Sequence, residues 1–109
     1  MNLCISNIAW KEFHEPKIFD FLKNKGFKCL EGAPARISPD LLDLNEEDLI
    51  KIKNKYNLMG LPLVSMQSLL FGSTNCHLFE SETSRRNLTE HLKKLIRISS
   101  SLGIKNLVF

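Results

Sequence analysis

Apolar residues in this chain follow two alternating patterns, short continuous runs and longer stretches with helical spacing. The runs predict β-strands at residues 2–6, 27–30, 61–66 and 105–109, separated by three helical segments. Gly26, Gly60 and Gly103 each stand between a helical segment and the next strand, where a left-handed residue commonly ends a helix. The predicted order is therefore β-α-β-α-β-α-β.

The first helical segment runs from Pro16, a favourable first-turn residue, to Gly26, and we expect Ile18, Phe21 and Leu22 on its apolar face. The next strand, 27–30, is followed by residues 31–36, where glycine and proline argue against a helix. Residues 37–44 then form a longer connection, with a short helical turn expected after Pro39.

The second helix begins clearly at Asn45, a good N-cap residue. The three acidic residues that follow place negative charge at the N-terminal end of the helix, where the helix dipole is positive. Its predicted apolar face consists of Leu49, Ile52, Tyr56 and Met59. Residues 67–80 form a long loop, and the third helix covers about 83–102. We expect that helix to bury Leu88, Leu92, Leu95 and Leu102 and to expose Arg85, Arg86, Lys93, Lys94 and Arg97.

Repeated right-handed β-α-β units make either an open doubly wound sheet or a barrel. An open nucleotide-binding sheet favours a glycine-rich turn after its first strand, and Ser6 to Trp10 contains no glycine. We therefore predict an α/β fold, the parallel half of a (β/α)8 TIM barrel, as a single domain over residues 1–109. Ending on a strand leaves a sheet edge open, so we expect a homo-oligomer formed through exposed sheet edges.

The charge and cysteine content narrow the class of protein. Fifteen basic and twelve acidic residues are interspersed, and their net charge of +3 gives no indication of nucleic-acid binding. No apolar run approaches the roughly 20 residues of a bilayer span, and no signal peptide is recognisable, so we expect a cytoplasmic protein. Cys4, Cys29 and Cys76 lack metal-site spacing and are expected to be free thiols, two of them within buried strands.

In a barrel, ligands bind at the loops that follow the carboxyl ends of the strands. Polar and aromatic residues in those positions are the candidate substrate-binding residues Asn7, Trp10, Glu31, Arg36 and Gln67. Four of them also have a structural interpretation: Glu31 could cap a neighbouring loop or helix, Gln67 could tie a loop, Trp10 could plug the barrel mouth, and Arg36 could be an exposed loop residue. We predict no catalytic residue and no metal ligand, because neither Glu31 nor His77 has neighbouring ligands at suitable spacing.

Several of these segments resemble one known family. The runs Ile5–Trp10, Leu30–Pro34, Met66–Gly72, Leu78–Phe79 and Asn106–Phe109, in this order, are similar to the start of a sugar phosphate isomerase/epimerase of the xylose isomerase-like TIM-barrel superfamily. The resemblance implies an eight-stranded barrel of which this chain is the N-terminal half. It also implies a divalent metal (Mn, Mg, Co or Zn) and acid/base carboxylates supplied mostly by later strands, and not bound by this half.

The resemblance implies a metal-dependent sugar or sugar phosphate isomerase or epimerase, in which a base removes a proton next to a carbonyl and the metal stabilises the enediolate. Alone, the 109-residue chain is expected to be inactive. Two alternatives remain open: part of an endonuclease IV-like metal-dependent nuclease for abasic DNA, and a non-catalytic half-barrel that associates with itself. We expect sugar ligands rather than nucleic acid or a membrane.

Overall fold

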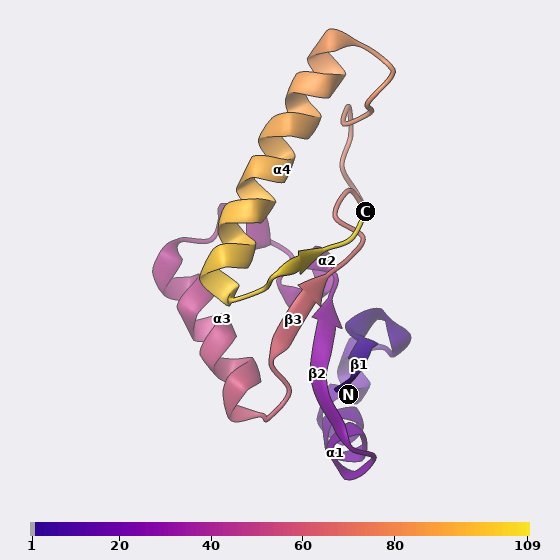
Figure 1. The fold of residues 1–109 in the computed structure, drawn as a ribbon, viewed down its shortest axis with the longest axis vertical. Helices are drawn as coiled ribbons and strands as arrows, with labels where there is room; N and C mark the ends of the chain where they lie inside the picture. Colours follow the sequence, from indigo (N-terminus) through magenta and orange to yellow (C-terminus); the bar gives the residue numbers. More distant parts are fainter. Residues whose placement is uncertain (1) are drawn as a thin grey trace.

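Four parallel strands form one sheet in a computed structural model that describes residues 2–109 (Figure 1). The strands are β1 (Leu3–Ser6), β2 (Phe27–Gly32), β3 (Leu63–Met66) and β4 (Asn106–Leu107). Their order in space, β1-β2-β3-β4, follows their order in the chain. This confirms the predicted parallel α/β fold and is compatible with half of a barrel, because a doubly wound sheet reverses its strand order at a switch point.

Helices connect the strands in the predicted alternation. The α-helices are α1 (Glu15–Asn24), α2 (Pro34–Ile37), α3 (Glu46–Leu58) and α4 (Glu82–Leu102). Short 3-10 turns occur at Asn7–Ala9, Glu12–His14 and Leu41–Asp43, and the last of these matches the turn expected after Pro39. Asn45 caps α3 as predicted, since its side-chain Oδ1 accepts a 2.9 Å hydrogen bond from the backbone N–H of Asp48.

The three glycines that were expected to end helices all adopt the left-handed conformation. Their φ angles are +83° at Gly26, +74° at Gly60 and +77° at Gly103. Side chains with a Cβ rarely adopt such angles, so glycine is the residue that lets each helix turn directly into the next strand. The sequence signal for these three turns is therefore confirmed.

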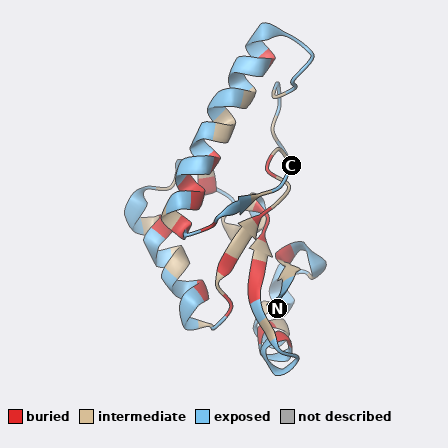
Figure 2. Cartoon of the chain, viewed as in Figure 1, coloured by how far each residue is buried: buried red, intermediate tan, exposed pale blue. Residues whose placement is uncertain are grey.

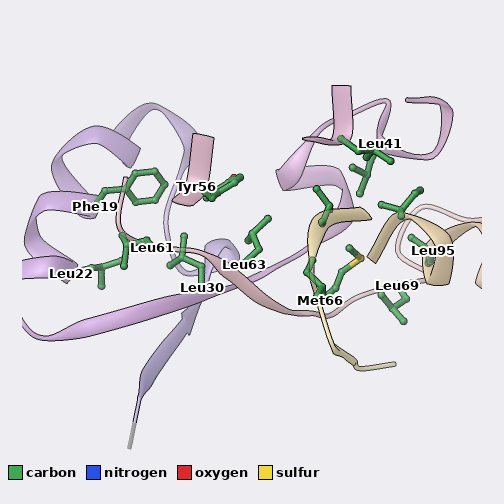
Figure 3. Packing of buried hydrophobic residues seen from close by; sticks show 14 residues of the cluster. Phe19, Leu22, Leu30, Leu41, Tyr56, Leu61, Leu63, Met66, Leu69 and Leu95 are labelled. Atoms are coloured by element: carbon green, nitrogen blue, oxygen red, sulfur yellow. The ribbon is translucent and has the colours of Figure 1, made fainter. Parts of the chain in front are cut away.

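The hydrophobic core lies between the sheet and the helices. Leu30 of β2 and Met66 of β3 are fully buried there with side chains from α1, α3 and α4 (Figure 3). Successive side chains of a strand point to opposite faces of its sheet. Glu31 and Ser65, which adjoin Leu30 and Met66, therefore point to the face of the sheet that is turned away from this core.

One segment predicted to be non-helical does form a helix. Pro34 opens the short helix α2, and the backbone N–H of Ser38 bonds to the Pro34 carbonyl at 3.1 Å. Proline is tolerated at the first turn because the N–H that it lacks has no partner there. The prediction took Pro34 as a helix breaker, whereas its position at the start of the segment makes it a helix initiator.

In the first strand and the first helix, two predictions about burial are wrong. The first strand is not buried: Leu3 is 47% exposed and Cys4 is also exposed, because β1 pairs only with β2 and forms an edge of the sheet. In α1 the buried residues are Phe19 and Leu22, whereas Phe21 is 54% exposed. The helix is rotated so that Phe19, and not Phe21, shares the core-facing side with Leu22.

The first half of α4 extends away from the sheet, beside the 67–81 loop (Figures 1 and 2). For this reason Leu88 and Leu92 are only half-buried, whereas Leu95 and Leu102 reach the core as predicted. The five basic residues predicted on its outer side are all exposed. Within residues 2–109, no helix has both the length and the apolar character needed to cross a bilayer.

Candidate functional site

A row of polar side chains crosses the sheet at the carboxyl ends of its first three strands. We call Ser6, Glu31, Ser65 and Gln67 the polar row. Strand register aligns Ser6 of β1 with Glu31 of β2, and Glu31 with Ser65 of β3. Ser65 Oγ donates a 2.6 Å hydrogen bond to Glu31 Oε1, and Gln67 Nε2 donates to Ser6 Oγ. Gln67 follows β3, so its side chain crosses over β2 to reach β1.

Two cysteines continue this face of the sheet toward the start of the strands. Cys4 and Cys29 are register partners on β1 and β2, and Cys29 lies two residues before Glu31. Desolvation, the neighbouring Cys29 thiol and the Glu31 carboxylate raise the pKa of Cys4 to about 12. All three cysteines of the chain are free, as predicted, although Cys4 lies in an exposed strand instead of a buried one.

The polar row consists of hydrogen-bonding groups. It offers one carboxylate, one carboxamide and two hydroxyl groups, all on half-buried residues. Metal binding needs several ligand side chains close together. In the part of the chain that the structure describes, no group of three or more His, Cys, Asp or Glu side chains could hold a metal ion. These residues do not fit the divalent metal that the family resemblance implies.

Asn7, another predicted site residue, lies fully buried at the end of β1. Its Oδ1 accepts a 2.9 Å hydrogen bond from the backbone N–H of Ala33, in the loop that leaves β2. Its Nδ2 has no partner among the described residues. Asn7 therefore joins the exits of two neighbouring strands, and its predicted contact with substrate stays a prediction.

Trp10 and Arg36 are brought together in a separate cluster. Arg36 Nη1 donates to the backbone oxygen of Trp10 at 3.1 Å, and Arg36 Nη2 forms a 3.1 Å ion pair with Glu15. The Trp10 ring packs edge-on against Phe19 with 6.1 Å between centroids. Both guanidinium ends are thus engaged in holding the loop after β1. Arg36 is therefore not an exposed loop residue, since it lies in α2 and is half-buried, and its predicted contact with substrate stays a prediction.

The sequence predicts two members of the polar row, Glu31 and Gln67, but not Ser6 or Ser65, which lie within strands. The signal that could have found Ser65 is the alternation in β3, where a serine beside the apolar Met66 must face away from the core. Parallel register then places it opposite Glu31.

A separate cavity of about 400 Å³ lies between the segment after β2, the 67–81 loop and α4. Its lining includes His91 of α4, which no sequence motif singles out. His91 Nε2 is 2.7 Å from the backbone oxygen of Leu69 and 3.4 Å from Ser73 Oγ. A carbonyl oxygen only accepts, so Nε2 carries a proton and cannot serve as a base for the Ser73 hydroxyl.

Comparison of the sequence with protein-family models and with curated protein sequences gave no match. The structure shows a small α/β domain with a four-stranded parallel sheet. Membership of the xylose isomerase-like superfamily stays a prediction.

Proposed function

We propose that this chain is the N-terminal portion of a cytoplasmic, metal-dependent sugar or sugar phosphate isomerase or epimerase, and that the polar row lines its sugar site. The observation that supports this most directly is the placement of the row. Ser6, Glu31 and Ser65 lie side by side at the carboxyl ends of parallel strands, on the face turned away from the helices. In a closed barrel that face lines the interior, and those strand ends surround the active site.

The chemistry of the row suits a hydroxyl-rich ligand. A carboxylate accepts hydrogen bonds from sugar hydroxyls, and the Gln67 carboxamide can both donate and accept. The Ser65 to Glu31 bond fixes Oε1 and leaves Oε2 outside that bond, at a half-buried position. The role we assign to this part of the protein is therefore to bind and orient the sugar.

The proposal assigns the metal and the acid/base pair to residues outside this sheet. The single carboxylate of the polar row cannot both remove and return protons on two sides of a substrate. We accordingly expect the 109-residue chain by itself to show no sugar isomerase activity with Mn²⁺, Mg²⁺, Co²⁺ or Zn²⁺. Turnover that appears with one of these ions and disappears with a chelator would contradict this division of roles.

The decisive experiment uses the longest reading frame that contains these residues. That product is screened for interconversion of aldoses, ketoses and their phosphates with each metal. We expect metal-dependent turnover that Glu31→Gln weakens, while Glu47→Gln, a control on the exposed first turn of α3, leaves it unchanged. Absence of turnover across the screen, with no sugar binding by calorimetry, would reject the proposal.

A second proposal, a non-catalytic half-barrel that associates with itself, is favoured by the apolar end of the chain. β4 pairs with β3 on one side only, and the residues after it, Val108 and Phe109, are 47% and 78% exposed. Open strand edges beside exposed apolar side chains promote association between chains. Both proposals predict contacts at this edge, and only the first predicts sugar binding.

A further inference from the structure

The cavity between the segment after β2 and α4 has an apolar floor. Leu41, Leu69 and Leu95 line it and are themselves buried, and Phe71 contributes an exposed apolar wall. Its volume of about 400 Å³ falls in the range typical of small-molecule sites, roughly 300–1,000 Å³. The floor can therefore cover a small hydrophobic group such as an aromatic ring or a short alkyl chain.

The rim of this cavity carries negative charge. Asp40 and Asp43 both line it, and none of its lining residues within 2–109 is Lys or Arg, although the chain as a whole carries a net charge of +3. Ser38 Oγ donates a hydrogen bond to Asp40 Oδ1, which orients that carboxylate. An anionic ligand such as a phosphate would meet repulsion here, whereas a cation would meet two partners.

His91 of α4 also lines the cavity and is tied to its wall. Its Nε2 proton is committed to the backbone oxygen of Leu69, 2.7 Å away. Two carboxylates above an apolar floor together match a ligand that has N–H donors at one end and a hydrophobic body at the other.

We propose that this cavity binds a small primary amine in its ammonium form, attached to an aryl or alkyl group. The ammonium group lies between Asp40 and Asp43, and the hydrophobic group packs against Phe71 and over Leu69. This site is independent of the proposed sugar function, because no member of the polar row lines the cavity.

Two-dimensional ¹H–¹⁵N NMR of the ¹⁵N-labelled 109-residue chain tests this directly. The chain is titrated with benzylamine, benzyl alcohol and benzoate, three probes of similar shape that are cationic, neutral and anionic. We expect saturable shifts at Leu69, Ser73 and His91 with benzylamine, weaker binding of the alcohol and none of benzoate. Equal binding of benzyl alcohol and benzylamine, or no saturable shift at these residues, would overturn the proposal.

Two variants separate charge recognition from simple filling of the cavity. Replacing both carboxylates, Asp40→Asn with Asp43→Asn, should weaken benzylamine binding on the order of five- to tenfold, because two partly exposed ion pairs are lost. Asp20→Asn, a control in α1 outside the lining, should leave binding unchanged. Ala35→Trp, at an exposed lining position, should block binding while the spectrum keeps its folded dispersion. Unchanged affinity in both test variants would place the amine elsewhere and refute the assignment.

Discussion

The side-chain Oδ1 of Asn7 accepts a 2.9 Å hydrogen bond from the backbone N–H of Ala33, 26 positions further along the chain. Both residues are buried, so the bond joins the ends of β1 and β2 away from water. We expect Asn7→Ala to lower the free energy of unfolding by about 1–3 kcal/mol, because the Ala33 N–H would be left buried without an acceptor. Urea denaturation followed by circular dichroism measures this change.

The ion pair between Arg36 and Glu15 should contribute more stability than a surface pair of the same kind. Their side chains are 22% and 17% exposed, against 70% and 80% for Arg86 and Glu82 on α4. Arg36→Met should cost about 1.5–3 kcal/mol, since it also removes the bond to the Trp10 carbonyl. Arg86→Met should cost less than about 1 kcal/mol. Equal losses in thermal melts would show that Arg36 does not hold the loop.

The sequence predicted the fold more completely than the site. Gly26, Gly60 and Gly103 are local signals that depend only on the backbone angle at one residue, and all three are confirmed. The exposure of Leu3 could not be predicted in the same way, because it depends on which strand lies at the sheet edge. Periodicity identifies a strand and does not give its neighbours.

The site residues show the same division between local and distant information. Glu31 and Gln67 were found because each lies near the end of a strand, which the chain pattern reveals. Their partners Ser65 and Ser6 depend on the register between strands, which sequence pattern alone does not fix here. The same applies to Arg36, whose ion-pair partner Glu15 lies 21 positions away.

Alkaline pH should destabilise the chain through Tyr56. Burial, aided by the nearby Glu15 carboxylate, raises the pKa of this phenol from 10.0 to about 12. The folded state therefore holds the proton more tightly than the unfolded state, and this contribution is complete below about pH 10 and is lost as the pH rises toward about 12. The Cys4 thiol adds a loss of stability in the same direction, because its pKa is raised from 9.0 to about 12 in the folded state.

The urea concentration at the midpoint of unfolding should decrease as the pH is raised from neutral to about 11. Tyr56→Phe should flatten the fall, because the unfolded state of that variant has no phenol to ionise. A slope identical to that of the parent chain would show that other groups cause the alkaline loss.

Self-association should depend on the apolar residues after β4. Replacing Val108 and Phe109 with lysine places charge beside the open strand edge, where it opposes pairing with a second chain. Sedimentation at micromolar concentration should then show more monomer. Leu58→Lys, a control at an 89% exposed position at the end of α3, should leave the distribution unchanged. A parent chain that is already a stable, folded monomer would argue against both the half-barrel and its self-association.

Substitutions in the longer protein that contains this chain can distinguish a role of the polar row in sugar binding from the role of core residues in stability. Glu31→Ala and Gln67→Ala should weaken sugar affinity measured by calorimetry, with little change in melting temperature, because both side chains are half-buried on the face turned away from the core. Leu63→Ala removes a buried core side chain and should cost about 2–5 kcal/mol of stability, while the molecules that remain folded keep their affinity. If Glu31→Ala lowers the melting temperature as far as Leu63→Ala and leaves affinity untouched, then the Ser65 to Glu31 bond serves the sheet, and the assignment of a sugar site fails.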